Sequence, residues 1–221
     1  MFDQISPRYD FLNHLLSLNS DVLWRRKAAA LLEGAHRVLD VCSGTGDMAL
    51  EIHRRWGAEV VGSDFAHRML AIGRLKAARR SLESRVRFQQ ADTLRLPYKD
   101  GVFDASTVAF GIRNVVDTEG GIREMTRVIR AGGRVVILEF TLPQNALLRQ
   151  GYLAYFGAVL PRIGRMIARS EIDAYKYLPE SVARWPRPDE LKAMMERAGL
   201  RDVSYHLVFG GVAAIHTGLR A

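Results

Sequence analysis

The sequence predicts an α/β protein with a doubly wound, mostly parallel sheet of seven strands that ends in an antiparallel hairpin. Three observations indicate this fold. Short apolar runs alternate with segments of helical periodicity, a glycine turn follows the first run, and Gly210-Gly211 joins the last two runs. Strands that alternate with helices are typical of a parallel sheet, and two runs joined by a short glycine turn are typical of a hairpin.

Length and composition favour one globular domain. The chain has 221 residues, of which 48% are hydrophobic and 25% charged, enough to bury a real core. We expect a single domain over residues 1–221, with an N-terminal helical cap over residues 1–32 and a helical insertion over residues 141–188 that forms a substrate lid.

The predicted elements follow one another in a regular order up to residue 140. Apolar residues recur with helical spacing between Asp10 and Leu32, which predicts one or two helices before the first strand. The next strands are expected at Arg37–Cys42, Glu59–Ser63, Val86–Gln90, Phe103–Ala109 and Gly133–Phe140. The helices between them are expected at Asp47–Trp56, Arg68–Ser81 and Glu119–Ile129, with Gly132-Gly133 breaking the chain before the fifth strand.

The regular alternation stops after Glu139. Residues 141–188 contain no convincing strand, and Leu147–Arg169 mixes apolar with arginine positions. Such a segment can cover a lipidic tail and touch an anionic membrane, or it can be a buried structural helix with solvated arginines. A helix at Asp189–Ala198 and strands at Asp202–Phe209 and Val212–Leu219 complete the predicted fold.

The most informative motif is the turn that follows the first predicted strand. Gly44-Thr45-Gly46 links this strand to a helix, and glycines at such a turn let a ligand lie against the backbone. Asp64 follows the second strand, where a carboxylate can accept both hydroxyls of a ribose. The pair predicts a bound nucleoside. Because residues 44–49 also fit G-x-G-x-x-A, a dinucleotide is the first alternative.

Three aspartates favour a cationic nucleoside. Asp40 lies in the first strand just before the turn, Asp64 ends the second, and Asp92 follows the third, where it can meet an adenine amino group. S-adenosylmethionine (SAM), with its sulfonium and amino groups, gains from these acids, whereas an anionic pyrophosphate does not. Unrelated turn or cap aspartates are the alternative. The residues expected to bind SAM are Asp40, Gly44, Thr45, Gly46, Ala49, Asp64, Phe65, Asp92, Thr93 and Ala109.

This pattern resembles the class I SAM-dependent methyltransferases, and further motifs over the whole chain resemble one family among them. These motifs are Tyr9–Ser17 with Trp24-Arg25-Arg26, Phe110–Asn114, Arg127–Gly133 with Leu138–Thr141, Tyr175–Ser181 and Phe209–His216. They are similar to the UbiE/MenG family, which methylates a ring carbon of a membrane quinol in menaquinone or ubiquinone synthesis. The resemblance therefore implies SAM-dependent C-methylation of a demethylated prenyl hydroquinone.

The resemblance also implies roles for individual residues. Arg113, Asn114 and Tyr177 would be catalytic, and Tyr9, Phe110 and Tyr175 would contact the substrate. Arg113 could stabilise the developing phenolate. Because arginine is a poor base, water or a carboxylate must then accept the proton. A salt bridge that organises the loop is the alternative role for Arg113, and packing is the alternative for the tyrosines.

Two departures from the family pattern bear on the site. Asp21 stands where the family usually has His, three positions before the Trp, close to the expected substrate entrance. Ala49 stands where a Thr is frequent, so one hydroxyl contact with the cofactor is expected to be missing.

Charge and cysteine usage bound the remaining possibilities. The formal net charge is +8, which attracts nucleic acid, anionic lipid or acidic ligands alike. The basic residues are spread along the chain without interleaved aromatics, so we expect no nucleic-acid partner; a basic nucleic-acid-binding protein without catalysis is the alternative from another class. SAM methylation of another lipidic or small aromatic acceptor is the alternative within the fold.

The single cysteine and the scattered histidines predict neither a disulfide framework nor a metal site. Cys42 is expected to be a small core residue of the first strand. With no secretory signal at Met1 and no apolar run of about 18 residues, we expect a cytoplasmic protein. Contact with the inner face of the membrane stays open, as does the oligomeric state, a homodimer included.

Overall fold

The computed structural model describes residues 17, 19–154, 181–182 and 184–221. Tyr9, Tyr175 and Tyr177 lie outside the described residues, as do most of the predicted N-terminal cap and most of the predicted insertion. Within the described part of the chain, no helix is both long enough and apolar enough to cross a membrane.

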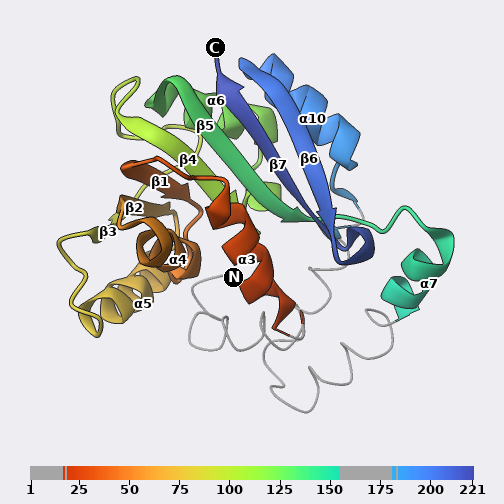
Figure 1. Ribbon diagram of the computed structural model, residues 1–221, viewed down its shortest axis with the longest axis horizontal. Coiled ribbons are helices and arrows are strands. Elements are labelled where there is room, and N and C mark those ends of the chain that lie inside the picture. The colour runs from red at the N-terminus through yellow and green to blue at the C-terminus, as the bar shows by residue number, and fades with distance from the viewer. Residues whose placement is uncertain (1–16, 18, 155–180, 183) are drawn as a thin grey trace.

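The sheet has seven strands in the order β3-β2-β1-β4-β5-β7-β6 (Figure 1). In chain order the strands are β1 Arg37–Val41, β2 Glu59–Asp64, β3 Val86–Gln90, β4 Phe103–Ala109, β5 Ile129–Phe140, β6 Leu200–Val208 and β7 Ala213–Arg220. The pairs β1–β2, β2–β3, β1–β4 and β4–β5 are parallel, and β7 runs antiparallel to both β5 and β6. This confirms the predicted doubly wound sheet and its C-terminal hairpin.

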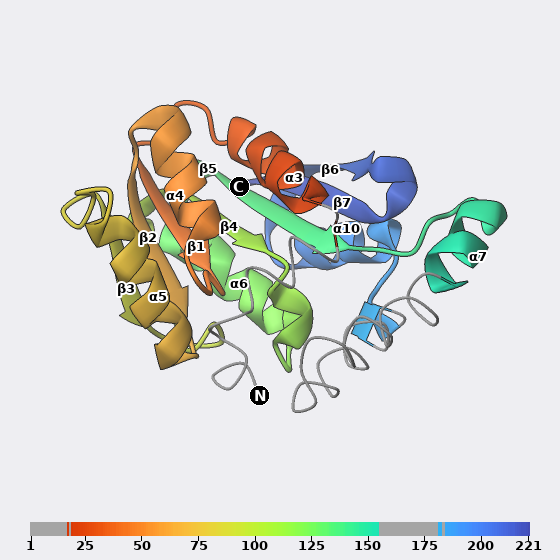
Figure 2. The same cartoon turned by 90° about the horizontal axis from the view of Figure 1, so that it is seen from below.

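Helices cover both faces of the sheet (Figure 2). They are α3 Ser20–Ala30, α4 Asp47–Trp56, α5 His67–Ala78, α6 Thr118–Val128, α7 Ala146–Ala154 and α10 Pro188–Arg197. One buried cluster joins α3, α4 and α5 to one face, and a second joins α6 and α10 to the other. Figure 1 shows α7 at the end of the molecule where β6 turns into β7.

The boundaries of β1, β2, β6 and β7 differ from the prediction by one or two residues, and the start of β5 differs by four. The fifth strand begins at Ile129, not at Gly133, because Ile129 already pairs with Phe103. The register then shifts to the pair Ala105 and Arg134, so the glycines form a bulge inside the strand, with Gly132 at a φ of 72°. The first strand ends at Val41, which leaves Cys42 beyond it.

Candidate functional site

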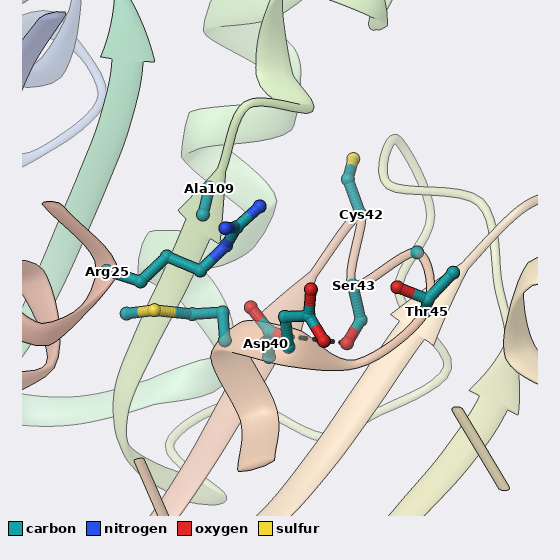
Figure 3. A pocket seen from close by; sticks show the side chains of 9 residues that line it. Arg25, Asp40, Cys42, Ser43, Thr45 and Ala109 are labelled. Atoms are coloured by element: carbon teal, nitrogen blue, oxygen red, sulfur yellow. Dashed lines mark hydrogen bonds between the residues drawn. The ribbon is translucent and has the colours of Figure 1, made fainter. Parts of the chain in front are cut away.

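The predicted site lies where β1, β2 and β4 end at their carboxyl termini, as expected for a parallel sheet. Two cavities meet there and share Cys42 and Gly44. The smaller is polar, and among the residues that line it are Arg25, Asp40, Ser43, Thr45 and Ala109 (Figure 3). The larger has a volume of about 500 Å³, and among the residues that line it are Asp64, Phe65, Asp92, Thr93, Phe110 and Asn114.

Asp40 is the most unusual residue of the smaller cavity. Its side chain is 0% exposed, and one carboxylate oxygen accepts a 2.5 Å hydrogen bond from the Ser43 hydroxyl. The other oxygen, Oδ1, is buried and has no hydrogen-bond partner among the described residues. Burial raises the pKa of Asp40 to about 7, against the opposing effects of the Ser43 hydrogen bond and the Arg25 charge. An unpaired buried carboxylate oxygen suits a ligand that brings an ammonium group.

Asp64 fastens the glycine turn to the end of β2. Its Oδ2 accepts a 2.8 Å hydrogen bond from the Gly44 amide, and its Oδ1 accepts one of 2.8 Å from the Ala66 amide. A carboxylate oxygen has two lone pairs, so Asp64 can still accept hydroxyl hydrogen bonds from a ribose in the larger cavity. The position of Asp64 therefore fits the predicted cofactor.

The two glycines of the turn are needed for different reasons. A Cβ on Gly44, whose φ is 55°, would lie 3.7 Å from the Met69 side chain, an ordinary van der Waals distance, so this backbone stays open to a ligand. A Cβ on Gly46, whose φ is 84°, would lie 2.5 Å from the Phe88 ring. Phe88 also excludes a side chain at Gly62 and at Gly73. Gly46 lines neither cavity, and packing against Phe88 accounts for its missing side chain.

The nucleoside end of the site is formed by β2, β3 and the segments that follow them. The Phe65 side chain is 75% exposed and lines the larger cavity, where an aromatic ring can lie against a base. Asp92 is exposed and accepts a 2.9 Å hydrogen bond from the Leu94 amide. The Thr93 hydroxyl lies 3.4 Å from the Cys42 sulfur. These residues fit the adenosine part of SAM.

The two alanines expected at the cofactor occupy different places. Ala109, the last residue of β4, lines the smaller cavity. Ala49 is fully buried in α4 and lines neither cavity. Contact between SAM and Ala49 thus stays a prediction.

Arg113 is held in a buried ion pair with Glu139, and it lines neither cavity. Its Nη1 lies 2.5 Å from Glu139 Oε1 and donates a 2.9 Å hydrogen bond to the Phe110 carbonyl. The two side chains are 7% and 1% exposed. The structure thus contains the loop-organising salt bridge that the sequence left as the alternative. The neighbouring Asn114 does line the larger cavity.

Cys42 is not the strand residue that the sequence predicted. It follows β1 with a φ of 51°, is half-buried, and lines both cavities. Burial raises the pKa of its thiol to about 12, so the thiol stays protonated at neutral pH and is a weak nucleophile. The sequence signal for this placement was its position directly before the Ser43-Gly44 turn.

Sequence reasoning also missed Arg25 as a site residue. It lies on α3, pairs with Asp21 one helical turn earlier, and its guanidinium reaches the smaller cavity (Figure 3). The spacing of four residues between Asp21 and Arg25 predicts such a pair on a helix, but not that the helix would face the glycine turn.

A buried acid beside an open glycine turn and a second acid at the end of β2 define, on this sheet, a class I SAM-dependent methyltransferase. The chain belongs to the ubiE/COQ5 methyltransferase family, whose model matches residues 1–220. It is 52% identical to the demethylmenaquinone methyltransferase of Thermus thermophilus, with 100% of each chain covered. It is 46% identical to the ubiquinone/menaquinone biosynthesis C-methyltransferase UbiE of Geobacter sulfurreducens, over 99% of this chain and 86% of the relative.

Solved structures support the same fold. A SAM-dependent methyltransferase of Thermotoga maritima superposes with a TM-score of 0.68 at 20% identity, covering 100% of this chain and 98% of that one. Phosphoethanolamine N-methyltransferase 2 of Haemonchus contortus, in complex with SAM, gives a TM-score of 0.65 at 14% identity, over 88% of this chain and 52% of that one. At such identities the likeness concerns the fold alone.

The raised pKa of Asp40 predicts a pH-dependent affinity for SAM. Because the pKa of Asp40 is about 7, most Asp40 carboxyls are protonated at a lower pH and cannot form an ion pair with an ammonium group. SAM binding should therefore tighten as the pH rises from about 5.5 to 7, by up to about tenfold per unit. The α-amino group of SAM stays protonated over this range. Titration calorimetry at each pH measures the effect.

Asp40→Asn provides the control for this pH dependence. The amide keeps the shape of the side chain but cannot ionise, so this variant should bind SAM weakly and with an affinity that is flat over the same range. A wild-type affinity that does not change with pH would show that binding of SAM does not depend on ionisation of Asp40.

Proposed function

We propose that this chain transfers the methyl group of SAM to a ring carbon of a demethylated prenyl hydroquinone, either demethylmenaquinol or the equivalent ubiquinone precursor. The observation that carries the proposal is the position of the family segment Phe110–Asn114. It follows β4 directly, and both Phe110 and Asn114 line the cavity in which Asp64 and Phe65 are expected to hold the nucleoside. The names of the full-length relatives support this choice of acceptor.

The proposed reaction needs an electron-rich carbon aimed at an electrophilic methyl group. SAM supplies the methyl group on a cationic sulfur. Loss of one phenolic proton from the hydroquinone pushes electron density onto the neighbouring ring carbon, which displaces the methyl group in line. The protein's contribution is to position the two molecules, to exclude water and to receive the proton.

Arg113 acts in this proposal by fixing the loop that faces the acceptor. Its guanidinium binds Glu139 and the Phe110 carbonyl at once, and it lies over the Phe140 ring at 5.4 Å from the centroid. These contacts fix the start of the segment at Phe110, and Asn114 at its end lines the larger cavity. The Asn114 amide is then able to bind a quinol oxygen. A permanently charged guanidinium cannot be the base, so the proton goes to water or to a carboxylate.

Substitution of Arg113 by lysine tests this positioning role. Arg113→Lys keeps a charge for Glu139 but loses the planar fork that also holds the Phe110 carbonyl. We expect kcat to fall about 10- to 100-fold, because small displacements of positioning groups are costly. The Kd of SAM should change by less than about threefold. The control is Arg123→Lys, whose side chain is 55% exposed and pairs at the surface with Glu119. Unchanged turnover in Arg113→Lys would disprove the role.

The acceptor is tested in a host that lacks its own quinone C-methyltransferase. Expression of this chain should convert the accumulated demethylated quinone into a product that carries one additional ring methyl, detected by mass spectrometry of the lipid extract. The Asp40→Asn variant should leave the quinone demethylated. If the purified wild-type protein binds SAM and the quinones stay unmethylated, the acceptor is another lipidic or small aromatic molecule.

We also propose peripheral contact with the cytoplasmic face of a membrane, where a prenylated substrate resides. Three large apolar side chains at the α7 end of the molecule are exposed: Leu147 at 80%, Leu148 at 53% and Phe209 at 67%. A Cβ on Gly210 would lie 3.1 Å from Leu148, so α7 and the β6–β7 connection adjoin (Figure 1). A basic protein with an exposed apolar patch is suited to an anionic lipid surface.

Vesicle flotation at low salt tests this contact. Wild-type protein should float with anionic liposomes, and Leu147→Glu combined with Phe209→Glu should reduce the floated fraction by more than half, because two carboxylates are repelled by the lipid surface. Leu75→Glu is the matched control, since Leu75 is 59% exposed but lies on α5, away from α7. Wild-type protein that stays at the bottom of the gradient would refute the membrane contact.

A further inference from the structure

The smaller cavity carries one positive and one negative side chain that do not satisfy each other. Arg25 reaches it from α3 and Asp40 from β1 (Figure 3). They are 8% and 0% exposed, and no ion pair joins them among the described residues. Two buried, opposite charges that face one small cavity complement a ligand that carries both charges a few bonds apart. An α-amino acid group is such a ligand.

Arg25 uses only some of its N–H donors in contacts with the described residues. Its Nη1 pairs with Asp21 Oδ2, and its guanidinium lies over the Phe110 ring at 5.3 Å from the centroid. A guanidinium has five N–H donors in a rigid plane and can bind two carboxylates at once. Asp21 is the only hydrogen-bond acceptor that the described residues offer to Arg25. The remaining donors are thus available to a ligand in the cavity.

Asp21 explains how a largely buried arginine is tolerated here. It is 1% exposed and accepts a 2.6 Å hydrogen bond from the Ser17 hydroxyl, which fixes its orientation. Its charge offsets that of Arg25, because an unpaired buried guanidinium would be strongly destabilising.

We propose that Arg25 binds the carboxylate of the amino-acid part of SAM, with Asp21 as the residue that positions it. Asp40 accepts a hydrogen bond from the ammonium group of the same amino acid. The smaller cavity therefore recognises both the carboxylate and the ammonium group of SAM. A SAM analogue without the carboxylate makes the Asp40 contact but loses the Arg25 contact. The proposal concerns the cofactor and is independent of the acceptor.

Decarboxylated SAM is the probe that isolates this contact. It keeps the adenosine, the sulfonium and the amino group and lacks only the carboxylate. By titration calorimetry, the wild-type protein should bind SAM about 10- to 100-fold more tightly than decarboxylated SAM, the range expected for a buried charge-assisted hydrogen bond. A wild-type protein that binds the two molecules equally would overturn the proposal without any variant.

A double variant removes the charge of Arg25 and keeps the local packing. Asp21→Asn with Arg25→Gln replaces the ion pair by a neutral amide pair, so no lone charge stays buried. Its affinity for SAM should fall to that for decarboxylated SAM, while binding of decarboxylated SAM should be unchanged or tighter. If both ligands lose affinity equally, Arg25 shapes the cavity and does not bind the carboxylate, and the proposal is wrong.

Three single variants complete the test. Asp21→Asn keeps the charge of Arg25 but loses the ion pair that positions it, so the preference for SAM should be reduced and not abolished. Arg26→Gln, at an exposed neighbouring position of α3, should behave as wild type. Asp40→Asn should weaken SAM and decarboxylated SAM alike, because both carry the ammonium group. Loss of the preference in Arg26→Gln would mean that general surface charge, and not Arg25, selects the carboxylate.

Discussion

A carboxylate buried without a full set of partners is the constraint around which this site is arranged. Asp40 is in the central part of the sheet, on β1 between β2 and β4, and is 0% exposed. Removing a carboxylate from water is costly unless hydrogen bonds and an opposite charge compensate. Ser43 supplies one hydrogen bond and Arg25 supplies a charge at a distance, but one oxygen stays unsatisfied. A cationic ligand provides the missing compensation.

The glycine turn that follows Asp40 depends on a second carboxylate, which stabilises the turn and is also positioned to bind a ligand. Asp64 bonds the Gly44 amide and so connects the β1–α4 turn to the end of β2. The Ser43 amide also donates to the Ser63 carbonyl at 2.9 Å. With the turn fixed at these points, Gly44 exposes its backbone to the cavities and Gly46 makes room for Phe88. The glycine pair is therefore shared between ligand binding and core packing.

The sequence predicted the sheet and its hairpin because alternating periodicity and glycine turns are local signals. It also placed Asp40, Asp64 and Asp92 at the correct strand ends, since a parallel sheet brings those ends to one edge. It could not predict the start of β5, because pairing of Ile129 with Phe103 is a contact between strands that no local pattern reports.

The environments of Arg113 and Arg25 were hidden for a related reason. From the sequence alone, an arginine in a loop is predicted to be solvent-exposed or catalytic, because its ion-pair partner is not known. The partner of Arg113, which lies in the loop after β4, is Glu139 on β5. The orientation of Arg25 toward Asp40 depends on how α3 packs against α4 and β5. Such tertiary pairings decide whether a charge faces a cavity or the core, and propensity does not encode them.

Arg25 and Arg113, each in a buried ion pair, both contact Phe110. Phe110 has a φ of 62°, a conformation that is unfavourable for a bulky aromatic residue. Arg113 holds its carbonyl, Arg25 lies over its ring, and its amide donates to the Leu138 carbonyl at 2.8 Å.

The Phe110 ring also packs on the Phe140 ring, with centroids 4.5 Å apart. Strain at one residue persists only where its surroundings over-determine it. Here the surroundings include both the predicted cofactor contact, Arg25, and the predicted acceptor loop, Arg113. Phe110 therefore contacts Arg25 at the smaller cavity and Arg113 at the loop that follows β4. The backbone conformation of this one residue thus depends on the packing of both regions.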